Sequence, residues 1–207
     1  MNSLTPERLD ALQEFINIGV GRAGAILNEM LSTHIMLNVP TVKVFHVSEL
    51  RDELAARFNW KHQFAAVQLG FSGTFSGMTE LLFPTDSACT LVSLLTGEEP
   101  NSPDLDAVKI GTLTEVGNIV INGVMGSIGN ILRKPISYSL PNYAEDTIEN
   151  LLLSERTITS AEAVFLLAQA RFEIAQLEII GDIILIFEMI SFDALLEVID
   201  CELGISL

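Results

Sequence analysis

The sequence predicts an α+β protein in which two similar halves share one antiparallel sheet. Two long helical patterns occur about half a chain apart, and each is followed by alternating or continuous apolar segments that are typical of strands. Two copies are too few for a solenoid, which needs at least three repeats. We therefore expect a pseudo-two-fold arrangement, with one sheet built from both halves and the two long helices covering one of its faces.

The chain has 207 residues, enough for one large domain or two small ones with a sizeable core. We expect a single domain over residues 1–207, made of two repeats at about 5–96 and 104–204. Their boundary is the polar, acidic and proline-bearing stretch 96–104. Aligning the halves matches Leu12 with Leu113, Glu14 with Glu115, Ile18 with Ile119, Leu31 with Leu132 and Ile35 with Ile136.

The first half begins with a helix whose apolar residues recur at helical spacing behind Thr5, the expected N-cap. The pattern then changes to alternation around Pro40, which is typical of an edge strand or of a strand interrupted by a bend. Ser72-Gly73 is a hairpin signal between two strands. The elements expected in order are a helix over 5–34, a strand over 35–47, a short helix over 49–58, strands over 63–71 and 74–83, and a helix over 84–95.

The second half repeats this order. Its ambiguous segment is 143–153, for which we expect a short helix, and Ser191 is the expected N-cap of the closing helix. Two apolar strands meet at Ala175-Gln176. The expected elements are a helix over 104–132, a strand over 135–140, the short helix, strands over 161–174 and 177–189, and a helix over 192–203.

The composition suits a compact protein, because 49% of the residues are hydrophobic and only 18% are charged. The formal net charge is −16. Such a surface repels phosphates, so we expect no nucleic-acid partner, whereas a protein with a basic surface remains an acceptable partner.

The cysteines, the N-terminus and the most apolar segment indicate a cytoplasmic protein. Cys89 and Cys201 form no C-x-x-C and are typical of small buried hydrophobes in a reducing compartment. The N-terminus has neither a basic nor an apolar signal-peptide region. Segment 177–190 carries three carboxylates and is too short to span a bilayer, so no membrane association is expected.

Several kinds of site are not indicated. The three histidines, His34, His46 and His62, are not spaced as zinc ligands, and no P-loop, nucleophile elbow or Rossmann fingerprint occurs. Gly19-Val20-Gly21 lies inside a helical pattern rather than after a strand. We expect no metal or cofactor of the protein's own.

One polar pattern occurs twice on the long helices. A Glu and an Asn stand three residues apart, so they share a helical face. An isolated pair of this kind is usually solvated surface, but the repetition in register, with a proline at the same distance downstream, favours a function. The two sets are Glu14, Asn17 and Pro40, and Glu115, Asn118 and Pro141.

The chemistry of this pair suits the positioning of water. An Asn amide takes no proton, but it donates and accepts hydrogen bonds at once, so it can hold a water molecule in line with a reactive bond. Phosphoryl transfer needs little more when another group supplies the metal and the charge neutralisation. The Glu one turn earlier can pair with a Lys or Arg of a partner.

The pattern resembles the motif of the CheC family of chemotaxis phosphatases, in the CheC/CheX/FliY superfamily. That motif is Asp or Ser, three residues, Glu, two residues, Asn, twenty-two residues and Pro. The first half matches at Asp10, Glu14, Asn17 and Pro40, whereas the second half has Gly111 at the leading position. The stretch 17–23 also resembles the family's Asn-Ile-Gly-x-Gly-x-Ala, and the likeness extends over essentially the whole chain.

The resemblance implies hydrolysis of the phospho-aspartate of a CheY-like response regulator. Each Asn would orient the attacking water, each Glu would contact a Lys of the regulator, and Mg²⁺ would belong to the phosphorylated regulator. Asp10, Pro40 and Pro141 would shape the site rather than do chemistry. Gly111 leaves the second site in question, since Thr112 and Thr114 face other directions on a helix.

The resemblance also implies a second partner, the deamidase CheD, although the sequence does not locate that interface. The alternative function is a non-catalytic module that binds the regulator or CheD, related to the middle domain of flagellar switch proteins. We expect catalysis, because both Glu/Asn pairs are present and no rotor domain follows the closing helix.

Overall fold

The computed structural model describes residues 4–31, 34–46, 49, 52–53, 62–97, 106–153, 163–174 and 177–204. Its strands are β1 (Ile35–His46), β2 (Gln63–Gly73), β3 (Gly77–Pro84), β4 (Ile136–Tyr138), β5 (Asn142–Thr147), β6 (Ala163–Ile174) and β7 (Leu177–Glu188). Its helices are α1 (Pro6–Leu31), α3 (Thr85–Thr96), α4 (Ala107–Ile131), α5 (Ile148–Leu153) and α6 (Met189–Leu203).

One sheet contains strands from both halves, as expected. Its order is β1-β6-β7-β3-β2-β4, with β5 also pairing with β2, and every pair is antiparallel. The edge strand β1 of the first half pairs with β6 of the second, while β4 and β5 of the second half pair with β2 of the first. The halves therefore exchange edge strands around a pseudo-two-fold axis between β3 and β7, which confirms the duplicated α+β fold.

The registers of the two halves agree residue by residue. β1 is continuous but shifts register between Asn38 and Thr41, on either side of Pro40. In the second half the corresponding chain is divided at Pro141 into β4 and β5. Before the proline, the pair Ile35–Ile174 corresponds to the pair Ile136–Gly73. After the proline, the pair Thr41–Gln169 corresponds to the pair Asn142–Gln68.

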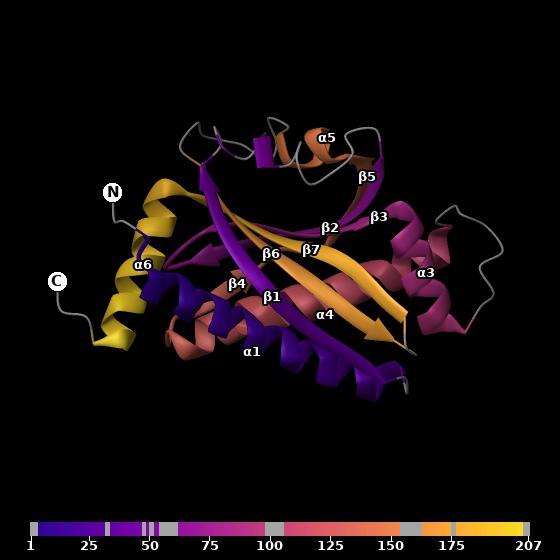
Figure 1. The fold of residues 1–207 in the computed structure, drawn as a ribbon, viewed down its shortest axis with the longest axis horizontal. Coiled ribbons are helices and arrows are strands. Elements are labelled where there is room, and N and C mark those ends of the chain that lie inside the picture. Colours follow the sequence, from indigo (N-terminus) through magenta and orange to yellow (C-terminus); the bar gives the residue numbers. More distant parts are fainter. Residues whose placement is uncertain are drawn as a thin grey trace.

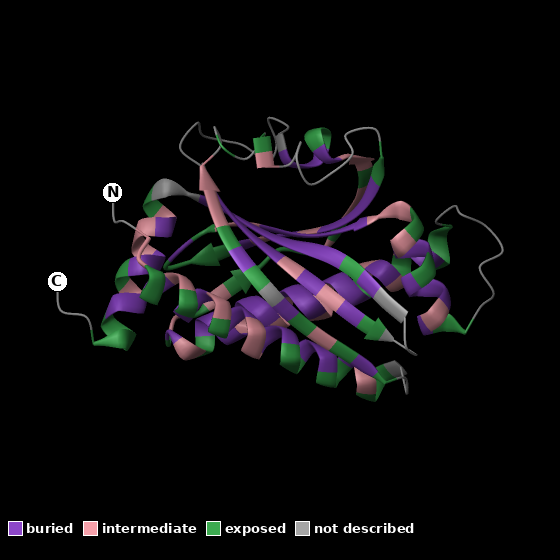
Figure 2. Ribbon diagram, viewed as in Figure 1, coloured by how far each residue is buried: buried purple, intermediate pink, exposed green. Residues whose placement is uncertain are grey.

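The two faces of the sheet carry separate apolar clusters, because successive strand residues point to opposite sides. Figure 1 shows α1 and α4 lying side by side and antiparallel across one face. They share a core with α3 and α6, to which β2 contributes Ala65, Val67 and Leu69. Phe64 and Ala66 of the same strand face the other side, where they join α5. Figure 2 shows the resulting buried stripes on the sheet and on the inner side of the helices.

The long helices approach closely where they cross. A Cβ on Gly19 would lie 2.5 Å from the Cα of Val124 and 2.7 Å from the carbonyl oxygen of Gly123. A Cβ on Gly123 would lie 2.9 Å from the carbonyl oxygen of Gly19. Neither contact is compatible with a side chain, so these glycines allow the two backbones to touch.

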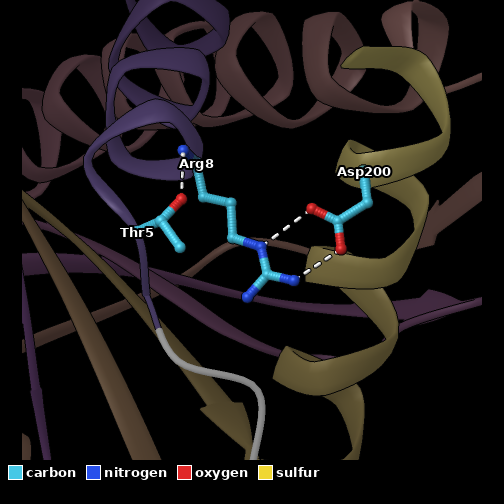
Figure 3. A network of polar contacts seen from close by, with 3 residues as sticks. All are labelled: Thr5, Arg8 and Asp200. Carbon is cyan, nitrogen blue, oxygen red and sulfur yellow. Dashed lines mark hydrogen bonds and ion pairs between the residues drawn. The ribbon is translucent and has the colours of Figure 1, made fainter. Parts of the chain in front are cut away.

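A buried ion pair joins the start of α1 to α6 (Figure 3). Arg8 Nε donates to Asp200 Oδ1 at 2.8 Å, and Arg8 Nη2 donates to Asp200 Oδ2. The Arg8 hydrogen bonds hold the pKa of Asp200 below its ordinary value, although burial opposes this effect. Thr5 accepts from the backbone N–H of Arg8 at 3.4 Å, as expected for the N-cap, so the pair is anchored to the first turn.

A row of polar side chains crosses the sheet face opposite the long helices. Asn142 donates to Gln68 Oε1 at 3.3 Å, and Gln68 donates to Glu80 Oε1 at 2.9 Å. Glu80 is fully buried, and its desolvation raises its pKa to about 8. The second half has the equivalent row, in which Gln169 faces both Thr41 and the buried Asp182.

The structure corrects four expectations from the sequence. Residues 143–147 belong to β5 rather than to a helix, because pairing with the edge of β2 outweighs local helix propensity; only 148–153 are helical. Ser72-Gly73 lies within β2, and the connection to β3 is 74–76. Ser191 lies inside α6, and its hydroxyl accepts from the backbone N–H of Ser76 at 3.2 Å. Cys201 is exposed, whereas Cys89 is buried as expected.

The remaining expected elements are present with small shifts at their ends. The first helix ends at Leu31, α4 begins after Asp106, whose carboxylate accepts from two backbone N–H groups, and the strand expected over 135–140 is limited to Ile136–Tyr138. Most of the helix expected over 49–58 and most of the boundary 96–104 lie outside the described residues. No helix in the described ranges is both long and apolar enough to cross a membrane.

Candidate functional site

Both Glu/Asn pairs lie on the outer surface of the long helices. Glu14 and Glu115 are exposed, and Asn17 and Asn118 are half-buried one turn further along the same faces. Because α1 and α4 are antiparallel, the two pairs are presented in opposite directions along the helical layer.

In the first copy, a backbone group of β1 holds the Asn. The backbone N–H of Val39 donates to Asn17 Oδ1 at 3.0 Å. This N–H is available because Val39 and Pro40 fall in the register shift of β1, outside the ladder with β6, and Pro40 itself has no N–H. Asp10 lies exposed one turn before Glu14. The structure thus brings the expected residues Asp10, Glu14 and Asn17 onto one surface.

In the second copy, a different group holds the Asn. The position equivalent to Val39 is Leu140, which is 88% exposed, whereas Val39 is 1% exposed. Here the strand is broken, and Ser139 anchors the loop by donating its backbone N–H to Gly70 O at 2.9 Å. Asn118 Oδ1 instead accepts from Asn122 Nδ2, one helical turn away, at 2.8 Å.

The second copy also lacks the leading polar residue. Gly111 is exposed, and a Cβ there would meet nothing within 4 Å. The neighbouring hydroxyls do not replace that side chain, because Thr112 donates to Val108 O and Thr114 donates to Ile110 O within the helix.

An open pocket of about 330 Å³ lies between the two helices beside Asn118. Its lining includes Arg22 of α1 together with Asn122 and Ser127 of α4. Arg22 Nη1 donates to Ser127 Oγ at 3.1 Å and so links the helices at the surface. These residues were not predicted from the sequence. The alignment of the two halves could have indicated Asn122, because it places this amide opposite Gly21 of the first copy.

Each copy therefore presents two groups that can contact a partner. The carboxamide oxygen of the Asn is engaged by one internal donor, which leaves its second lone pair and its NH₂ group for a ligand or water. The exposed carboxylate of the Glu is available for a charge-assisted hydrogen bond. Among the described residues, no group of three or more His, Cys, Asp and Glu side chains is arranged to hold a metal ion.

Comparison with known proteins gives one curated relative and a set of solved structures, and no family model matches the chain. The relative is the CheY-P phosphatase CheC of Bacillus subtilis (strain 168). It is 24% identical over 152 residues, which cover 70% of this chain and 69% of that protein.

The solved structures share the fold at low identity. The crystal structure of Thermotoga maritima FliY has a TM-score of 0.77 at 18% identity, over 97% of this chain and 100% of that one. FliM in the FliG–FliM complex from H. pylori has a TM-score of 0.65 at 12% identity, over 94% and 100% of the chains. The CheX–CheY–BeF3–Mg complex from Borrelia burgdorferi has a TM-score of 0.50 at 22% identity, over 85% and 99% of the chains.

These solved structures have the fold described above. This chain is therefore similar in sequence to the B. subtilis CheC and shares its fold with the solved structures named above.

Proposed function

We propose that this protein hydrolyses the phospho-aspartate of a CheY-like response regulator, using Glu14 and Asn17 as one site and Glu115 and Asn118 as a second. The observation that carries this proposal is common to both copies. In each, an internal donor fixes the carboxamide oxygen of a half-buried Asn, beside a Glu that is exposed one turn earlier.

A fixed amide is suited to placing a nucleophilic water. Once Oδ1 accepts from Val39 or Asn122, the direction of the NH₂ group and of the remaining lone pair is defined before the partner arrives. Water held between these groups can be aligned with the phosphorus–oxygen bond, and alignment supplies much of the acceleration in phosphoryl transfer. The Glu would dock the regulator through a basic side chain.

The relatives support the proposed partner. The B. subtilis relative is a CheY-P phosphatase, and the B. burgdorferi CheX structure contains CheY, BeF3 and Mg. We propose that here too the Mg²⁺ arrives with the phosphorylated regulator, since the chemistry assigned to Glu and Asn needs no metal ligand from this chain. CheD stays a second proposed partner.

We assign positioning roles to three further residues. The register shift around Pro40 exposes the N–H of Val39 to Asn17, and Pro141 lies in the equivalent break of the second copy. Asp10 extends the polar surface next to Glu14. None of the three is assigned a step in the reaction.

The test is phosphate release from a phosphorylated CheY-like regulator with Asn17→Ala, Asn118→Ala and the double variant. We expect each single variant to retain part of the activity, and the double variant to lose about a hundredfold, because alignment of the water is lost at both sites. A double variant with full activity would rule out this site assignment.

The alternative function is a non-catalytic adaptor that binds a regulator or a flagellar switch component. It is favoured by the fold shared with FliM in the FliG–FliM complex. The two functions differ in turnover: an adaptor binds the phosphorylated regulator stoichiometrically and leaves the lifetime of the phosphoryl group unchanged.

A further inference from the structure

Asn122 of α4 has no counterpart in the first copy. The aligned halves place it opposite Gly21, whose position on α1 is exposed and has no heavy atom within 4 Å of a Cβ. Asn122 Nδ2 donates to Asn118 Oδ1 at 2.8 Å. The two residues are four apart on a helix, a spacing at which amide side chains bond well.

The bond replaces a contact that the second copy has lost. In the first copy, Asn17 Oδ1 is held by the backbone N–H of the buried Val39. The equivalent Leu140 is 88% exposed, in the break between β4 and β5. Among the described residues, the donor to Asn118 Oδ1 is Asn122 Nδ2.

The buried oxygen of the half-buried Asn122 supports a role beyond packing. Its own oxygen, Oδ1, is buried and has no hydrogen-bond partner among the described residues. A buried, unpaired amide oxygen is unfavourable, and Asn is a poorer helix former than Ala. A residue that only packed at this position would need no amide group, whereas a hydrogen-bond donor to Asn118 requires one.

We propose that Asn122 is a positioning residue of the second site, which holds the Asn118 carboxamide in the orientation that the β1 backbone imposes on Asn17. This inference rests on the proposed phosphatase function. Asn122 itself touches neither the water nor the regulator; it acts through Asn118 alone.

The experiment isolates each site in turn by measuring steady-state phosphate release. In an Asn17→Ala background only the second site operates, and Asn122→Ala should then lower kcat about tenfold, with KM unchanged because docking through Glu115 is intact. Asn122→Gln, which keeps an amide donor, should restore most of the rate. Asn130→Ala, an exposed residue of the same type lining the same pocket, is the matched control and should have no effect.

The reciprocal background controls for folding. In Asn118→Ala only the first site operates, so adding Asn122→Ala should leave the rate unchanged, which also demonstrates that the chain is folded. An unchanged kcat in the Asn17→Ala background, or an equal loss in both backgrounds, overturns the positioning role. Absence of phosphatase activity in the wild type overturns the proposed function instead, so the two failures are distinguishable.

Discussion

The two halves of the molecule present the same pair of side chains but support them differently. In the first half, a backbone N–H of a bulged edge strand holds Asn17. In the second half the strand is broken, and a side chain from the same helix holds Asn118. A duplicated motif thus specifies which side chains are presented, while the contact that orients them depends on local strand geometry.

In the centre of the sheet the two halves are chemically alike, whereas on the helical layer they are not. Gln68 stands beside the buried Glu80, and the equivalent Gln169 stands beside the buried Asp182. The halves therefore diverge at the proposed site surface, whereas these polar pairs of the sheet are chemically alike in both halves.

The largest expected effect concerns this shared centre. Because burial raises the pKa of Glu80 from about 4.5 to about 8, the unfolded state ionises first as pH rises. The contribution of Glu80 to stability is therefore full below pH 4.5 and is lost as pH rises toward 8, by on the order of 4 kcal/mol. Glu80→Gln should abolish this fall, as measured by urea unfolding at pH 5 and pH 8. The exposed Glu29→Gln is the control, and equal wild-type stability at both pH values would contradict the prediction.

The next effect tests the anchoring of the first long helix. Asp200→Ala removes the carboxylate that pairs with the buried Arg8, and we expect a loss of about 3 kcal/mol in unfolding free energy at pH 7. Since the folded pKa of Asp200 is lowered, the pair stabilises the protein above the unfolded value of about 3.9, and this stabilisation is lost as pH falls through the folded value. The difference between wild type and variant should therefore shrink in acid. Glu197→Ala, exposed on the same helix, should change little.

A smaller effect tests the helix crossing, where the halves are not equivalent: Gly19 of α1 aligns with Val120 of α4. Gly19→Ala would place a Cβ 2.5 Å from the Val124 backbone, so we expect a destabilisation of about 2 kcal/mol in urea unfolding. Gly21→Ala is matched in chemistry but meets open space, and it should stabilise the helix by up to about 1 kcal/mol. Similar values for both variants would exclude close packing at Gly19.

The smallest effect addresses the missing polar residue of the second copy. Gly111→Ser gives this copy the leading residue of the family motif at a position with free space. In an Asn17→Ala background we expect phosphate release to rise about twofold or less, because Asp10 is assigned to shaping the site rather than to chemistry. A rise of tenfold or more would show that the leading residue takes part in the reaction.

The two long helices, most strands, the duplication and the shared face of Glu14 and Asn17 could be predicted from the sequence alone, because periodicity and one-turn spacing depend only on neighbouring residues. Tertiary structure decided what depends on distant contacts. Pairing with β2 made 143–147 a strand, α1 acquired its ion pair from Asp200, and Asn17 acquired its donor from Val39. Asn122 depends on both. Its spacing from Asn118 is visible in the sequence, but its hydrogen bond is needed only because Leu140 is exposed in the folded chain.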